Sequence, residues 1–186
     1  MPETVPSQTA RPSGRPQFPG DGAGSTAVEF ALVATPLIAL CVAALQSSII
    51  FFAEQQLQTA TRDAARLLKR ITGDSLSQSL SADDFTGAVC QRAAPAFDCA
   101  GLMIDVESIP SFAGGPIPPL SLTYDARGRV TNRWTYSPGG PGDVVIVRVM
   151  YRWPVFGALL GTGLANQPDG SRLLTGVALY KNEPAA

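Results

Sequence analysis

The 186-residue sequence contains no histidine. This absence excludes Ser-His-Asp and Cys-His catalytic groups, histidine-ligated zinc and acid–base catalysis by an imidazole. Charged residues are also scarce, at 16% against about 25% in an ordinary soluble domain. The 14 basic and 15 acidic side chains give a net charge of −1, so the chain lacks a basic footprint and we expect no nucleic-acid partner.

Cysteine is rare as well, and only Cys41, Cys90 and Cys99 occur. The separation of the last two is too long for a CxxC redox motif or zinc half-site, and further metal ligands are lacking around them. We therefore expect no metal site and no cofactor. A disulfide between Cys90 and Cys99 is expected if this region lies in an oxidising compartment, whereas two buried free thiols are expected in a cytosolic protein.

The N-terminal part combines a polar leader with a long apolar run. Residues 1–24 are rich in Pro, Gly, Ser and Thr, which predicts a disordered leader. From Phe30 to Ala53 there is no charged residue, and these 24 residues rise about 36 Å as a helix, enough to cross a hydrocarbon layer of about 30 Å. We predict a transmembrane helix over residues 25–53, which Pro36 should kink or loosen. The alternative is a buried helix of a soluble protein.

The helical pattern continues beyond the apolar run, over residues 54–73. Apolar side chains recur there at helical spacing, while the complementary face is polar and mostly basic. We predict an amphipathic extension that packs its apolar stripe against the C-terminal domain. The apolar stripe is Leu57, Ala60, Ala64, Leu67, Leu68 and Ile71, and the polar face is Gln58, Arg62, Arg66, Lys69 and Arg70.

Residues 74–186 are expected to form a small α+β domain. Ser81 and Asp84 form a possible capping box for a short helix over Ala82–Ala93, which would bury Phe85 and Val89. Runs rich in β-branched and aromatic residues then predict an antiparallel sheet of about four strands. The predicted strands are residues 102–109, 129–137, 143–153 and 171–182, with a hairpin turn at SPGGPG, residues 137–142.

Several side chains of this domain are of types that could serve as functional groups. Asp83 and Asp84 fall in the first turn of the short helix, and Asp105 and Glu107 fall on the polar side of an alternating strand. We therefore expect both pairs to be solvated surface rather than catalytic carboxylates. The aromatic residues are expected to pack on the sheet, although contact with a glycan or another surface is an alternative; they are Trp134, Tyr136, Tyr151 and Trp153.

A distinctive pattern marks the start of the apolar run. Glu29 is the fifth residue after Gly24, and an isolated carboxylate at the edge of lipid is costly. This pattern resembles the cleavage and assembly signature of type IV pilins and pseudopilins. The continuation FAEQQLQTATRDAARLLKR extends the resemblance, over about residues 24–72, to the TadE/TadG-like minor pilins of the tight-adherence pilus.

The resemblance implies that a prepilin peptidase cleaves between Gly24 and Ser25, so that Glu29 and Phe30 become the fifth and sixth mature residues. A Glu29 carboxylate could then neutralise the new α-amino group of a neighbouring subunit and fix the axial register. The implied partners are inner-membrane lipid, the prepilin peptidase, other pilins and pilus assembly proteins. The implied protein is a non-enzymatic, single-pass, pilin-like subunit of the inner membrane with a periplasmic domain.

Two further observations bear on topology and processing. The leader carries two basic residues, Arg11 and Arg15, whereas four basic residues follow the apolar run. The positive-inside rule therefore opposes a periplasmic location of the C-terminal domain. Residues 42–44, Val-Ala-Ala, also satisfy a signal-peptidase site, which would start the mature chain at Leu45. The alternative function is therefore a periplasmic binding or scaffold protein without a pilus role. A membrane-anchored glycosidase is disfavoured, because no pocket supports it.

Overall fold

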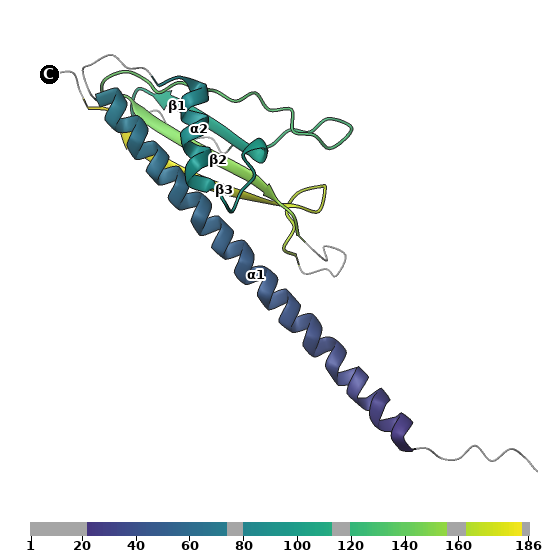
Figure 1. Cartoon of the computed structure of the whole chain (residues 1–186). Coiled ribbons are helices and arrows are strands. Elements are labelled where there is room, and N and C mark those ends of the chain that lie inside the picture. The colour runs from purple at the N-terminus through teal and green to yellow at the C-terminus, as the bar shows by residue number, and fades with distance from the viewer. Residues whose placement is uncertain (1–21, 74–79, 113–119, 156–162, 184–186) are drawn as a thin grey trace, which may run out of the picture. The chain divides into compact units, whose positions relative to one another are not determined.

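The computed structural model describes residues 22–73, 80–112, 120–155 and 163–183. Two helices, α1 (Gly22–Gly73) and α2 (Ala82–Ala93), precede a short 3₁₀ turn, η1 (Cys99–Gly101). Three strands follow, namely β1 (Leu102–Ile109), β2 (Val144–Trp153) and β3 (Arg172–Lys181). The fold is therefore α+β, as predicted, with a long N-terminal helix followed by a small antiparallel sheet (Figure 1).

The chain divides into two units between Cys41 and Val42. Helix α1 is continuous across this division and through Pro36. It begins at Gly22, so the last three residues of the expected leader are helical. The rest of the leader, residues 1–21, lies outside the described residues, as do residues 74–79. In the first unit, the apolar side chains of α1 are exposed, as a lipid-facing helix requires.

The sheet has the order β1-β2-β3, and each neighbouring pair is antiparallel. Leu102 of β1 faces Tyr151 of β2, and Trp153 of β2 faces Arg172 of β3. The central strand is rich in β-branched residues and is buried on both faces over its first seven residues, which are apolar except for Arg148. The sheet is thus built around β2.

The prediction of a strand over residues 129–137 is wrong, because this segment forms only isolated bridges. This segment makes one isolated parallel bridge, between Tyr136 and Val106 of β1, with Thr135 and Ser137 supplying the two backbone hydrogen bonds at 2.8 Å. The SPGGPG sequence is consequently not a hairpin turn. It carries the chain past the end of β1 into β2, with Gly139 at φ +70° against Ser108.

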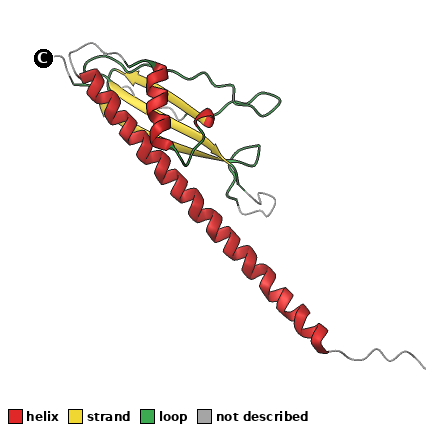
Figure 2. Ribbon diagram, in the orientation of Figure 1, coloured by secondary structure: helices red, strands yellow, loops and turns green. Residues whose placement is uncertain are grey.

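Both helices pack on the same face of the sheet in the second unit (Figure 2). The predicted packing of the amphipathic extension is confirmed, because Leu57, Ala64 and Leu68 are almost completely buried. Lys69 lies 3.5 Å from Glu183, just beyond the end of β3, so α1 follows β3 in the same direction. The core formed with the sheet consists of Ile50, Ala53, Leu57, Ala60, Ala64, Ala65, Leu68, Phe85, Val89, Ala93, Phe97, Val106, Val145, Val147, Val149 and Leu174.

The short helix α2 matches its prediction. The Ser81 hydroxyl accepts a hydrogen bond from the Asp84 backbone N–H at 3.1 Å and donates one to the Asp84 carboxylate at 2.6 Å. Phe85 and Val89 are fully buried, and the Phe85 ring lies 5.7 Å from the ring of Tyr136. The cap therefore fixes where α2 begins, and its apolar face fixes which side meets the sheet.

Candidate functional site

The candidate cleavage and assembly residues lie at the start of α1. Gly24 is exposed, and a Cβ added there would meet no atom within 4 Å. The Ser25 hydroxyl donates a hydrogen bond to the Glu29 carboxylate at 3.3 Å, one helical turn further on. Phe30 is 74% exposed. The sequence-predicted residues thus lie within the first turns of α1 and are exposed among the described residues.

The helix carries an apolar surface from Val28 to Phe52. Among the described residues this is the one helix long and apolar enough to cross a membrane, judged by length and composition. Its large apolar side chains are between 43% and 74% exposed. They are Val28, Phe30, Leu32, Val33, Leu37, Ile38, Leu40, Val42, Leu45, Ile49, Phe51 and Phe52.

The attachment of α1 to β3 depends on one glycine. Gly176 faces α1, and a Cβ at this position would collide with the hydroxyl of Thr61 and lie 3.0 Å from the Leu57 carbonyl oxygen. Thr61 is fully buried, and its hydroxyl donates to the Leu57 carbonyl at 2.7 Å. The small side chains of α1 and the missing side chain of Gly176 together allow helix and strand to approach this closely.

A second contact ties α1 to the outer edge of β3. The Gln58 side-chain amide donates to the Val177 carbonyl oxygen at 2.8 Å, and its oxygen accepts from the Val177 N–H at 3.0 Å. Gln58 therefore lies on the predicted polar face, but it contacts β3 there. Periodicity placed it with the basic residues, but the edge of β3 lies close enough for a glutamine to satisfy both backbone groups of one residue.

A buried ion pair links β1 to β2. Asp105 and Arg148 are cross-strand partners, both less than 10% exposed, with 2.9 Å between the guanidinium and the carboxylate. Arg148 also lies 3.1 Å from Glu107, and Asp105 accepts a further hydrogen bond from the Thr135 N–H. The prediction that Asp105 is solvated surface is wrong. Strand alternation places Asp105 on the polar face of β1, but it does not reveal that Asp105 is buried there by Arg148 and the Thr135 backbone.

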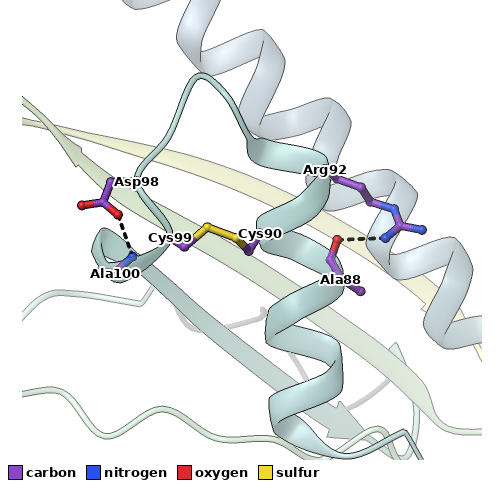
Figure 3. The surroundings of a disulfide bond; sticks show 6 residues. All are labelled: Ala88, Cys90, Arg92, Asp98, Cys99 and Ala100. Atoms are coloured by element: carbon purple, nitrogen blue, oxygen red, sulfur yellow. Dashed lines mark hydrogen bonds between the residues drawn. A yellow bond between two sulfur atoms is a disulfide. The ribbon is translucent and has the colours of Figure 1, made fainter.

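Cys90 of α2 is joined to Cys99 of η1 by a disulfide, with 5.3 Å between their Cα atoms (Figure 3). Asp98 caps the 3₁₀ turn by accepting from the Ala100 N–H at 3.1 Å. The loop closed by the disulfide contains Phe97, whose ring packs against those of Tyr151 and Trp153. The disulfide therefore holds one end of α2 to the start of β1.

A hollow of about 520 Å³ in the second unit lies beside the end of β2, and both acidic and basic side chains line it. Arg152 lies 3.1 Å from Asp169 within the lining, and Arg129 lies 2.8 Å from Asp125 outside it, so both arginines of the lining are paired. The Ser171 hydroxyl hydrogen-bonds to Asp169 and lowers the pKa of that carboxyl, with Arg152 adding to the effect. Within the described ranges, no three His, Cys, Asp or Glu side chains gather as metal ligands.

The exposed helix end and the apolar run that follows it lie in a segment that matches a known family model. Residues 24–66 match the family model described as TadE-like protein. The segment is TadE-like. The match begins at Gly24 and includes Glu29, Gln58 and Thr61, so it spans the candidate cleavage site, the apolar run and the first contacts with β3. Searches of curated proteins and of solved structures each gave no match.

The TadE-like segment covers less than a quarter of the chain. The β3 residues that α1 contacts and the buried ion pair between β1 and β2 lie outside this segment. Gly176, Val177 and Arg148 were missed by the sequence analysis. A glycine in the middle of an otherwise branched strand was the one signal available, because such a residue often marks a close approach of another backbone.

Proposed function

We propose that the protein is a membrane-anchored, pilin-like subunit that acts in assembly of a tight-adherence pilus. The TadE-like segment and its single apolar helix indicate a pilus-related, membrane-anchored protein. The buried ion pair joins neighbouring strands and the disulfide joins α2 to the start of β1, which fits a structural role.

One observation carries the proposal. The helix that exposes its apolar side chains up to Phe52 is the same continuous helix that supplies Leu57, Thr61 and Leu68 to the core of the folded domain. A domain built on such a helix is coupled mechanically to its anchor, because separating them requires breaking helical hydrogen bonds or exposing the core. A subunit pulled from the membrane into a filament needs this coupling, whereas a released periplasmic binding protein does not.

Processing after Gly24 is part of the proposal. The scissile bond lies in the first turn of α1, where backbone N–H groups lack helical partners and the helix frays most easily. Cleavage would create an α-amino group on Ser25, one turn from the Glu29 carboxylate that the Ser25 hydroxyl now contacts. In an assembly, Glu29 of one subunit would instead pair with the α-amino group of its neighbour and set their axial register.

The mature N-terminus tests processing directly. Mass spectrometry of the membrane fraction should give a chain that begins at Ser25. A start at Leu45 would replace this proposal with the signal-peptide alternative, and an intact N-terminus would leave an anchor without a peptidase step. Gly24→Val is the matched variant: since a Cβ at Gly24 meets no atom within 4 Å, the fold is kept and only cleavage should fail.

The compartment of the domain needs a separate test, because the charge distribution around the apolar run opposes export. Non-reducing peptide mapping of freshly isolated protein should recover Cys90 and Cys99 cross-linked and Cys41 as a free thiol, which serves as the internal control. Alkylation of all three thiols would place the domain in the cytoplasm and contradict the proposed topology.

A further inference from the structure

A small apolar hollow marks the place where the folded domain first meets α1. It measures about 100 Å³ and is lined by Gln46, Ile49 and Ile50 of the helix and by Trp153, Pro154 and Val155 at the end of β2. Along the described part of α1, Ile50 is the first residue buried to 4%. From this residue on, one face of the helix belongs to the core, whereas none of residues 24–49 is buried.

The depth of this hollow along α1 follows from the sequence. Ile49 and Ile50 precede Glu54, the first charged residue after the apolar run, by only five and four positions, or about 6–8 Å along the helix axis. If α1 spans a bilayer, this level corresponds to the boundary between acyl chains and headgroups. The end of β2 lies at that same level, because Trp153 and Val155 line the same hollow as Ile49 and Ile50.

The chemistry of the residues at this level suits such a boundary. Phe51 and Phe52 are 64% and 62% exposed, Pro154 is exposed, and Trp153 and Val155 are half-buried. Tryptophan is enriched where membrane meets water, because it offers a large apolar ring and a polar N–H.

We propose that the end of β2, formed by Trp153, Pro154 and Val155, is a second membrane contact that rests in the headgroup boundary beside α1. The occupant of the hollow is lipid, since its lining is continuous with the exposed apolar surface at Ile49, Phe51 and Phe52. This inference rests on the proposed membrane anchor. It adds that the domain sits against the bilayer surface and orients itself by this contact, rather than standing clear of it.

Lipid-specific quenching tests the contact on the full chain, reconstituted at one chain per nanodisc. The chain has two tryptophans, so Trp134→Phe leaves Trp153 as the only one, and Trp153→Phe leaves Trp134 as the matched control. Trp134 lines a separate hollow with Leu102 and Ile104 of β1, and Val149, the β2 partner of Ile104, is four positions, or about 13 Å, from Trp153 along β2. Phosphatidylcholine brominated near the headgroup, compared with unbrominated lipid, should quench Trp153 several-fold more than Trp134.

A pair of charge variants sharpens the test. Pro154→Glu introduces a carboxylate at an exposed position of the contact and should reduce the quenching of Trp153 severalfold. Pro110→Glu, also exposed but at the opposite end of the sheet, should leave it unchanged. Equal effects of the two variants would contradict a contact at Pro154.

A dye on Cys41, the single free thiol, separates this inference from the anchor itself. Lipid brominated near the chain ends should quench the dye. If it does, but Trp153 is quenched no more than Trp134, the anchor stands and the second contact is refuted. If neither is quenched, both are refuted. Quenching or protection of Trp153 that appears only with two chains per nanodisc would assign the surface to another subunit instead of lipid.

Discussion

The side chain of Gln58 satisfies both backbone groups of Val177 on the outer edge of β3. Edge strands present unpaired N–H and C=O groups that invite another strand, and natural proteins cover or block them. Helix α1, which exposes an apolar surface nearer its N-terminus, covers part of that edge through Gln58. The contact also fixes the rotation of α1 about its axis, because a glutamine reaches one strand residue only from one helical face.

Gln58→Leu should destabilise the folded domain by about 1–2 kcal/mol, because two partly buried backbone groups lose their partner. Gln58→Glu should lose less, since it keeps an acceptor for the Val177 N–H. Gln56→Leu, at an exposed position two residues earlier, is the control and should change little. Urea unfolding of the full chain in detergent measures all three. Equal losses for Gln56→Leu and Gln58→Leu would show that the edge contact contributes nothing.

The buried pair between Asp105 and Arg148 predicts an asymmetric response. Arg148→Ala leaves a carboxylate buried without its guanidinium and should cost about 3–5 kcal/mol. Replacing both partners, as Asp105→Leu with Arg148→Met, should cost much less, because no charge is then buried alone. Arg127→Ala, at an exposed site, controls for loss of an arginine in general. A double variant as unstable as Arg148→Ala would contradict this account.

Tyr180 predicts a loss of stability in alkaline solution. Burial, with a smaller contribution from nearby Tyr136, raises the pKa of Tyr180 well above its usual value. The folded domain therefore keeps this phenol protonated at a pH where the unfolded chain ionises it. Stability should be unaffected below about pH 10 and should fall above it by up to about 1.4 kcal/mol per pH unit.

Tyr180→Phe should remove that part of the pH dependence. Near neutral pH the same variant should be at least as stable as the parent, because the hydroxyl is buried without a hydrogen-bond partner among the described residues. Thermal unfolding of the two proteins between pH 7 and pH 11 provides the comparison. Parallel pH profiles would mean that Tyr180 ionises equally easily in the folded and unfolded chains.

Glu29 predicts a separation of processing from assembly. It contacts only the Ser25 hydroxyl among the interactions described for it, so Glu29→Ala should leave folding, membrane insertion and cleavage intact. Subunit cross-linking and piliation should be lost, because a neighbour's α-amino group in the helix bundle would lack its partner, at a cost of about 3–5 kcal/mol. Glu29→Gln keeps the shape but not the charge and should fail in the same way.

Immunoblot mobility, cross-linking and microscopy of one strain set measure these three outcomes side by side. Glu29→Asp serves as the control that retains the charge on a shorter side chain. Normal piliation in both neutral variants would mean that Glu29 has no role in register and is simply a tolerated carboxylate near the start of a helix.

The failures of the sequence-based predictions have a common physical cause. Residues 129–137 have the branched and aromatic composition of a strand, yet propensity describes how well a segment suits a sheet, not whether a strand edge is available to it. Only one bridge to β1 forms there. Asp105 and Gln58 were likewise assigned to polar faces correctly, but a polar face can be covered when it finds partners for its hydrogen bonds.

The sequence by itself determined everything that depends on neighbours along the chain. The length of α1, the apolar run, the cap at Ser81, the spacing of Glu29 from Gly24 and the TadE-like segment are all local. Tertiary structure alone decided which strands pair, that Gly176 admits Thr61, and that the charge of Asp105 is buried against Arg148. Those contacts join residues that are far apart in sequence, and their energies depend on distances that exist only once helix and sheet have met.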